Sequence, residues 1–301
     1  MTEFEKAFGV PSNDPSLRGA SFLARRNECY RYVGVHTPDP LGDSYVVLQC
    51  AITDEIYMRS EMISWGAYNL MLKPEKGKLI YIEGVDSVGK ATQTRLLAAH
   101  LRSLGKYVVT LTYPNYGKPI GQIIKRYLNG EFGEASTIHP ELISCAYALD
   151  RAKDSSFIKQ ALEDGHWVIL DRSPYSNSAF QGGKLDHEDG MVVARHLAAL
   201  EFDAVNFPKP DKVFFLDAKP SIAMELMASR SKHASVAADG KKDQHESNHQ
   251  LLDSAYGIYK ALCEENSEWE GIPIIDTQTE ALRTPEAISK EIQSFVSQWI
   301  K

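Results

Sequence analysis

The chain of 301 residues is long enough for one large domain or two domains of ordinary size. Hydrophobic residues make up 43% of the chain and charged residues 24%, which is the composition of an ordinary globular protein. The formal net charge of -7 provides no overall basic field, so we expect no nucleic-acid partner.

The cysteine pattern and the hydropathy exclude further classes of protein. The four cysteines lie far apart and form no CxxC pair, which disfavours a zinc site or a disulfide framework and indicates a reducing compartment. No run of about 18 apolar residues occurs, so we expect no membrane span and no membrane partner. The N-terminus, MTEFEKAFGV, lacks a basic segment followed by an apolar one and does not resemble a secretory signal. We therefore expect a cytoplasmic protein.

Residues 1–76 are expected to form a small β-rich N-terminal module. A polar stretch, VPSNDPSLRGAS, precedes three strand-like runs, YRYVGVH, SYVVLQCAI and IYMRSEMISW. Turn residues separate these runs, and KPEKGK at residues 73–78 has the composition of a linker. No chemistry can be assigned to this module from its residues, so a role in oligomerisation and a role in docking a partner both stay open.

Residues 77–301 have a different pattern, in which buried-type strands alternate with helices. The expected strands are short apolar runs rich in β-branched and aromatic residues: LIYIEG, YVVTLTYP, HWVILDRS, KVFFLDA and IPIIDT. Such runs suit strands that are covered on both faces of a parallel sheet. The alternation predicts an α/β fold, a doubly wound parallel five-stranded sheet of the P-loop NTPase-like kind, with right-handed crossovers.

Two helices show clear apolar faces. In the segment TQTRLLAAHLRSLGK, Leu97, Leu101 and Leu104 form one stripe, and Gly105 is expected to cap the C-terminus. The apolar face of the last helix is expected to consist of Ile288, Ile292, Phe295 and Trp299.

The segment EGVDSVGKATQ, residues 83–93, has the spacing of a phosphate-binding loop. It follows a buried strand and precedes an amphipathic helix, which is the context that such a loop requires. Glycines let backbone N–H groups approach the phosphates, the helix N-terminus adds positive potential, and Lys90 can reach the β- and γ-phosphates. The expected ATP-binding residues are Gly84, Val85, Asp86, Ser87, Val88, Gly89, Lys90, Ala91 and Thr92.

Ala91 departs from the usual pattern, because the residue after the loop lysine ordinarily carries a hydroxyl group for Mg²⁺. Thr92 is a poor substitute, since one helical step turns its side chain about 100° away. We expect Asp171, at the end of a buried strand, to hold Mg²⁺ through water, with ATP as the phosphate donor. The alternative is that Ala91 marks a catalytically weak, regulatory nucleotide-binding protein.

Several motifs in consistent order carry a resemblance to a known family: IEGVDSVGKATQ, YPNYGKPIGQIIKRYL, CAYALDRAKD, DRSPYSNSAFQGGK, KPDKVFFLD and DQHESNHQLL. Residues 78–301 resemble the thymidylate kinases, which transfer the γ-phosphate of ATP to dTMP. The resemblance implies that the ligands are ATP and a deoxynucleoside monophosphate, and that the protein is a homodimer. Residues 1–76 lie outside it.

The resemblance implies contacts to the base and to the sugar of the acceptor. Tyr147 would stack on the base, and Arg151, one helical turn later, would bond the edge of the base. Ser176 or Asn177 would touch the base, and Phe180 would close the sugar side of the pocket.

The resemblance also implies contacts near the phosphates. Asp86 would hold the 3′-hydroxyl of the deoxyribose, and Arg172 would bridge the acceptor phosphate and the transferring phosphate. Many family members carry an arginine in the loop after the second strand, where this chain reads YPNYG, so Tyr116 is expected to donate its hydroxyl instead. One branch of the family has an arginine after the loop aspartate, where this chain has Ser87; the other branch supplies that cation from a lid.

The polar segment at residues 229–248 has the composition of a lid that closes over the site. The candidate cations for the γ-phosphate are Arg230, Lys232, Lys241 and Lys242. Arg230 is the catalytic candidate among them, with stacking on adenine as its alternative role. Together with Lys90, Asp171 and Arg172 it completes the expected catalytic set.

A deoxynucleoside kinase is the nearest alternative enzyme. Such an enzyme phosphorylates a neutral 5′-hydroxyl and benefits from a carboxylate base near the end of the second strand. Here that position reads TYPNYG, without Asp or Glu, which favours an acceptor that is already an anionic monophosphate. We expect the base to be thymine or a related 5-substituted uracil.

Overall fold

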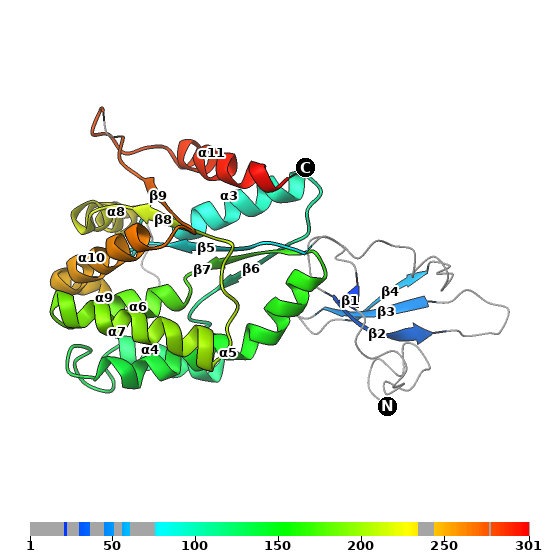
Figure 1. The fold of residues 1–301 in the computed structure, drawn as a ribbon, viewed down its shortest axis with the longest axis horizontal. Coiled ribbons are helices and arrows are strands. Elements are labelled where there is room, and N and C mark those ends of the chain that lie inside the picture. The colour runs from blue at the N-terminus through cyan, green and yellow to red at the C-terminus, as the bar shows by residue number, and fades with distance from the viewer. Residues whose placement is uncertain are drawn as a thin grey trace.

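The computed structural model describes most of the chain from residue 76 onward and four short segments before it (Figure 1). The described ranges are 21–22, 30–36, 45–50, 56–60, 76–233, 244–276 and 278–300.

The four N-terminal segments form an antiparallel sheet of their own. Its strands, in spatial order, are β1 (Ser21–Phe22), β2 (Tyr30–His36), β3 (Tyr45–Cys50) and β4 (Ile56–Ser60). The three strand-like runs expected from the sequence correspond to β2, β3 and β4, whereas β1 was not expected. Among the described residues, these strands share no ladder with the second sheet.

The second sheet has five parallel strands in the order β6-β7-β5-β8-β9. The strands are β5 (Leu79–Glu83), β6 (Val108–Thr112), β7 (Trp167–Asp171), β8 (Lys212–Asp217) and β9 (Trp269–Pro273). Every residue of β5 and β7 is buried, as expected for central strands covered on both faces. The predicted α/β fold with a five-stranded parallel sheet is confirmed.

The position of the fifth strand was predicted incorrectly. The apolar run IPIIDT placed it at residues 272–277, but β9 begins at Trp269 and ends at Pro273. Its ladder with β8 pairs Val213 with Trp269 and Asp217 with Pro273. The strand therefore ends where β8 ends, and pairing with the neighbour overrides the local hydrophobic run.

Helices cover both faces of the sheet, with α3 and α11 on one side and α5, α6 and α7 on the other (Figure 1). The helices are α3 (Lys90–Ser103), α4 (Pro119–Leu128), α5 (Pro140–Glu163), α6 (Pro174–Gly182), α7 (His187–Ala199), α8 (Pro220–His233), α9 (Gln244–Ser247), α10 (His249–Glu265) and α11 (Pro285–Val296). A π-helical turn, η2 (Leu200–Ala204), continues α7, and a 3₁₀ turn, η3 (Ser297–Trp299), follows α11. None of the helices in the described ranges is long and apolar enough to cross a membrane.

The apolar faces of the two outer helices agree with the prediction at all positions but one. Leu97 and Leu101 are buried, and Gly105 follows the helix with φ of 78°. The N–H of Lys106 donates to the Leu101 carbonyl at 3.0 Å, as in a glycine-terminated helix end. Leu104 is 47% exposed, because it is the C-cap and no longer follows the helical stripe. Ile288 and Ile292 of α11 are buried, and Phe295 of α11 and Trp299 of η3 pack against the core.

Candidate active site

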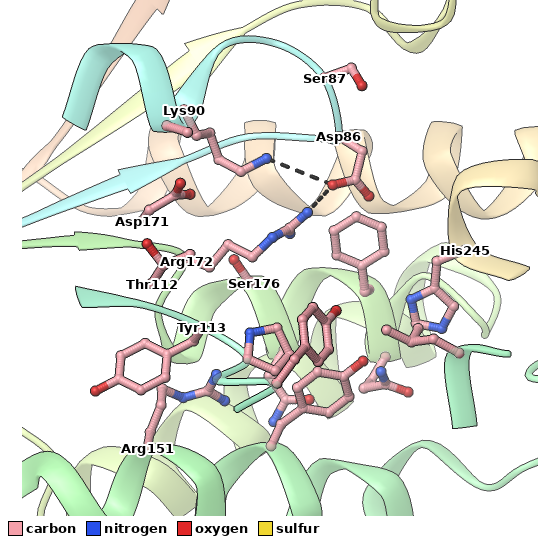
Figure 2. Close-up of a pocket in the computed structure, with 18 of the residues that line it drawn as sticks. Asp86, Ser87, Lys90, Thr112, Tyr113, Arg151, Asp171, Arg172, Ser176 and His245 are labelled. Atoms are coloured by element: carbon pink, nitrogen blue, oxygen red, sulfur yellow. Dashed lines mark hydrogen bonds and ion pairs between the residues drawn. The ribbon is translucent and has the colours of Figure 1, made fainter. Parts of the chain in front are cut away.

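A cavity of about 510 Å³ opens at the carboxyl ends of β5, β6 and β7 (Figure 2). Ligands bind in this position in open α/β sheets, because the loops that follow the strands converge there. Most of the residues expected from the sequence meet in it. The lining residues are Asp86, Ser87, Gly89, Lys90, Ala91, Thr92, Thr112, Tyr113, Pro114, Tyr116, Leu128, Tyr147, Arg151, Asp171, Arg172, Ser176, Asn177, Phe180, Gln181 and His245.

The loop between β5 and α3 forms one wall of this cavity. Gly84 and Gly89 have φ of 142° and 104°, which only glycine adopts readily, and Ser87 has φ of 66°. Lys90 is 7% exposed, and its Nζ donates to the carbonyl oxygens of Gly84 at 3.0 Å and Val85 at 2.7 Å. The loop therefore folds back around its lysine, so that the ammonium group lies within the ring of backbone groups that would hold phosphates.

The expected ATP-binding residues divide into two groups. Six of them line the cavity, from Asp86 to Thr92 with the exception of Val88. Gly84, Val85 and Val88 do not line it, and the two valine side chains are buried in the core. These three residues shape the loop through their backbone, and the two valine side chains do not reach the cavity.

Asp86 and Arg172 approach each other across the cavity. The Arg172 guanidinium forms an ion pair with Asp86, and the Lys90 ammonium lies 3.9 Å from the same carboxylate (Figure 2). Arg172 has φ of 70°, an unfavourable backbone conformation for a residue other than glycine. Such strain is concentrated at functional sites, and here it directs the arginine back toward the phosphate loop.

Asp171 is a buried carboxylate at the end of β7. Burial raises the pKa of its side chain, and the nearby positive charge of Lys90 opposes that rise. Ala91 lies in the first turn of α3 and presents no hydroxyl group to the cavity. In the described ranges, no group of three or more His, Cys, Asp or Glu side chains could hold a metal ion.

The helices α5 and α6 form the opposite wall. Tyr147 is 9% exposed and lines the cavity, and Arg151 is buried one helical turn later. Asn177 and Phe180 project from α6 into the same wall. The Arg172 guanidinium lies 5.5 Å from the centre of the Phe180 ring. The base-side and phosphate-side residues expected from the sequence thus line one continuous cavity.

The hydroxyl of Ser176, one of the expected base contacts, is already engaged within the protein. The Ser176 hydroxyl donates to Glu83 at 2.6 Å, and Glu83 also accepts from Ser173 and Tyr259. Tyr116 also lines the cavity, and 40% of its surface is exposed. Ser176 therefore has the weaker claim of the two α6 candidates to a ligand contact.

Comparison with known proteins agrees with this geometry. A family model described as thymidylate kinase matches residues 82–282. The chain belongs to the thymidylate kinase family. Membership implies an ATP-dependent phosphotransferase. The resemblance inferred from the motifs is thereby confirmed.

Curated thymidylate kinases from three organisms illustrate the relationship. The Legionella pneumophila enzyme is 32% identical over 228 residues, which are 75% of this chain and 96% of the relative. The Mycobacterium tuberculosis enzyme is 31% identical over 196 residues, or 64% of this chain and 88% of the relative. The Plasmodium falciparum enzyme is 34% identical over 149 residues, or 50% of this chain and 65% of the relative.

The solved structure of thymidylate kinase from Candida albicans has the same fold. It superposes with a TM-score of 0.55 at 21% identity and covers 74% of this chain and 92% of its own. At this identity the similarity establishes the fold alone. The substrate is inferred from the residues that line the cavity.

His245 lines the cavity, although the motifs of the sequence indicated no role for it. The imidazole, on α9, lies parallel to the Phe180 ring with the ring centres 5.5 Å apart, and its Nε2 lies 2.8 Å from the Tyr127 hydroxyl. Burial, with the positive charges of Lys184 and Arg172, lowers the pKa of His245 to about 3. The sequence contained a signal, because His245 belongs to the matching segment DQHESNHQLL, but no role could be read from it.

Two parts of the expected lid are helical. Residues 229–233 continue helix α8, and Gln244–Ser247 form α9. Gln244 attaches α9 to the loop after α4, since its side-chain oxygen accepts from the N–H of Ala135 at 2.6 Å. The remaining lid residues, 234–243, and the side chain of Arg230 lie outside the described part of the structure, so the expected lid cations stay predictions.

Proposed function

We propose that this protein transfers the γ-phosphate of ATP to dTMP, or to a related 5-substituted dUMP, and releases the corresponding diphosphate. One observation carries the proposal: a single cavity joins the phosphate loop around Lys90 to the wall that contains Tyr147, Arg151 and Asn177. Arg172 lies between these two ends, paired with Asp86. The arrangement suits a donor phosphate at one end and a pyrimidine nucleotide at the other.

In the proposed reaction, an oxygen of the acceptor phosphate attacks the γ-phosphorus of ATP. The bond between that phosphorus and the β,γ-bridging oxygen breaks, and ADP leaves with the electron pair. The acceptor is already anionic, so no general base is required, in agreement with the absence of a carboxylate from the TYPNYG segment after β6. Catalysis then consists of positioning and of neutralising the negative charge.

Each positively charged residue would help to position or neutralise particular phosphate groups. Lys90 would hold the β- and γ-phosphates, and Arg172 would bridge the acceptor phosphate and the γ-phosphate. Asp86 would exchange part of its pairing with Arg172 for the 3′-hydroxyl of the deoxyribose. Tyr116 would donate its hydroxyl to the acceptor phosphate. Arg230 would add a further cation from the proposed lid.

The residues present fit Mg²⁺ bound mainly by ATP. This ion keeps several waters and is held in kinases by substrate phosphates with few protein groups. Asp171, a cavity carboxylate at the end of β7, would hold the ion through water. When bound, the ion would neutralise phosphate charge, while Lys90 would orient the γ-phosphate.

Ala91→Thr is expected to lower the Mg²⁺ concentration for half-maximal activity by a few-fold and to change kcat little. The added hydroxyl contributes on the order of one neutral hydrogen bond or less, because the phosphates supply most of the metal's ligands. The measurement is turnover against Mg²⁺ concentration, with Ala99→Thr, at an exposed position of the same helix, as the matched control.

The contrary outcome would change the proposed function. If the natural protein shows no turnover at high Mg²⁺ and Ala91→Thr creates it, then Ala91 marks a lost catalyst. The protein would then be a nucleotide-binding regulator.

A panel of acceptors tests the proposed function directly. With ATP and Mg²⁺, turnover is measured on dTMP, dUMP, 5-hydroxymethyl-dUMP, dCMP, dGMP and the nucleoside deoxythymidine. We expect a preference for dTMP or for one 5-substituted dUMP. Preference for a purine monophosphate would contradict the proposal, and preference for deoxythymidine over dTMP would make the protein a deoxynucleoside kinase.

We further propose that residues 77–301 form the complete kinase domain. The sheet β5–β9 takes no strand from the N-terminal region in the described residues, and the N–H of Gly77 donates to the Leu162 carbonyl at 2.7 Å. Deletion of residues 1–76 is expected to leave a folded kinase whose KM for dTMP and for ATP is unchanged. Circular dichroism and steady-state kinetics check this, and an insoluble fragment would show that the module belongs to the core.

Family resemblance also supports a homodimer as the assembly. Leu142 and Leu149 lie two helical turns apart on α5 and are strongly exposed, as is Val192 on α7. Apolar side chains in such positions suit a contact with a second copy.

A further inference from the structure

Glu201 is a fully buried carboxylate behind the cavity wall. It lies on the π-helical turn η2, where its relative exposure is 0%, and it does not line the cavity. Nothing in the motifs of the sequence indicated a role for it. A buried carboxylate is costly unless charged and polar partners surround it, so its contacts explain why it is tolerated.

The partners of Glu201 are the two base-side residues. Its Oε2 accepts from Arg151 Nε at 2.6 Å, and its Oε1 accepts from Arg151 Nη2 and from Asn177 Nδ2, the latter at 3.0 Å. Burial by itself lowers the pKa of Arg151, but the Glu201 carboxylate outweighs that effect and raises it. The guanidinium is therefore charged and held in a fixed plane.

These contacts orient the amide of Asn177. Its Nδ2 donates to Glu201 and also to the Ser144 carbonyl at 3.3 Å, so both of its hydrogens are used. A flipped amide would place Oδ1 against the carboxylate, and two acceptors would then face each other. Oδ1 is itself buried and has no hydrogen-bond partner among the described residues, which leaves it as the unsatisfied acceptor of this wall.

The Glu201 carboxylate also determines which nitrogen of Arg151 is left for a ligand. Since Nε and Nη2 point to Glu201, Nη1 is the guanidinium nitrogen left for a ligand, in a residue that lines the cavity. The wall thus offers one acceptor, Asn177 Oδ1, and one donor, Arg151 Nη1. Thymine and uracil present the complementary pair, the N3–H donor beside the O4 acceptor, whereas cytosine presents an N3 acceptor beside a 4-amino donor.

We propose that Glu201 is a positioning residue that sets the base preference of this site, favouring a keto pyrimidine over an aminopyrimidine by fixing the Asn177 amide and the Arg151 guanidinium. The inference rests on the proposed function, because it assumes that the acceptor base lies against this wall. It assigns the preference to a residue that touches no substrate.

Glu201→Gln tests the inference while keeping the shape of the side chain. The amide has one acceptor oxygen, so its NH2 group must face either Arg151 Nε or both Arg151 Nη2 and Asn177 Nδ2, and the fixed arrangement of the two base-side residues is loosened in either orientation. We expect the affinity for dTMP to fall about tenfold, the effect of one buried hydrogen bond, and the ratio of dTMP to dCMP affinity to fall by a similar factor. The affinity for ATP should not change, because the phosphate loop is untouched.

The measurement is calorimetric titration of dTMP and dCMP, without ATP, into the natural protein and its variants. Asn177→Ala removes the acceptor that Glu201 orients. Adding Glu201→Gln to Asn177→Ala should therefore cause a smaller further loss of preference than Glu201→Gln causes by itself, because only the positioning of Arg151 remains to be lost. Glu264→Gln, an exposed carboxylate on α10, is the matched control and should retain both affinities.

An unchanged dTMP-to-dCMP ratio in Glu201→Gln would overturn the inference, as would equal losses for dTMP, dCMP and ATP, which would indicate a purely structural role. If Glu201→Gln does not fold, Glu201→Asp replaces it. The shorter carboxylate should lower the ratio of dTMP to dCMP affinity below that of the natural protein, and an equal ratio would overturn the inference. Absence of any dTMP preference in the natural protein also overturns it. A natural protein that binds dTMP selectively but forms no dTDP contradicts the proposed function and leaves this inference standing.

Discussion

Lys90→Ala is expected to abolish turnover. The Lys90 ammonium is the cation enclosed by the phosphate loop, where it contacts two backbone carbonyl oxygens and lies 3.9 Å from Asp86. Phosphoryl transfer relies on charge neutralisation, and loss of one preorganised donor to a developing negative charge typically lowers kcat by about 10²–10³. Loss of a full positive charge at the γ-phosphate should bring the rate to near background.

The measurement is ADP release with dTMP as the acceptor, together with the dissociation constant for dTMP. That constant should change little, because Tyr147 and Arg151 lie on the opposite wall of the cavity. Lys290→Ala is the matched control, since Lys290 is exposed on α11 away from the cavity. Turnover of Lys90→Ala within about tenfold of the natural rate, a change of only about 1.4 kcal/mol in the barrier, would contradict the assigned role.

Tyr147→Ala is expected to raise the KM for dTMP by roughly 10–100-fold. The ring lies in the cavity wall formed by α5, one helical turn before Arg151. Stacking of a base on an aromatic ring contributes about 1–3 kcal/mol, which corresponds to this range of affinity. The KM for ATP should stay nearly the same.

Steady-state kinetics with each substrate varied in turn distinguish a base contact from simple packing. Tyr147→Phe serves as the control, because it keeps the ring and should keep most of the affinity for dTMP. An equal loss of affinity for ATP and for dTMP in Tyr147→Ala would mean that the ring supports the fold of both walls and does not stack on the base.

The parts of this protein that could be predicted are those encoded by neighbouring residues. The phosphate loop was recognised because its glycines, its lysine and the flanking strand and helix all lie within residues 79–103. The strands β5, β7 and β8 were found because central strands of a parallel sheet are continuous apolar runs. The edge strand β9 was misplaced, because its register depends on pairing with β8 and not on its own apolar residues.

The sequence identified residues that line the candidate site, but it did not identify the contacts between them. Tyr147, Arg151 and Asn177 were identified by their motifs, and each lines the cavity. The partner of Arg151 is Glu201, 50 residues later, and the residue beside Phe180 is His245, on α9. Neither contact follows a helical or strand period, so no pattern along the chain could reveal it.

The amino-acid sequence alone determined that this chain folds as a parallel α/β domain with a phosphate loop, because local periodicity and glycine spacing depend on near neighbours. Only the tertiary structure decided that Asp86 pairs with Arg172, and that Glu201 holds both Arg151 and Asn177. These contacts join elements far apart in the chain. Their directions depend on how the helices pack on the sheet, and that packing decides which donors and acceptors remain for a ligand.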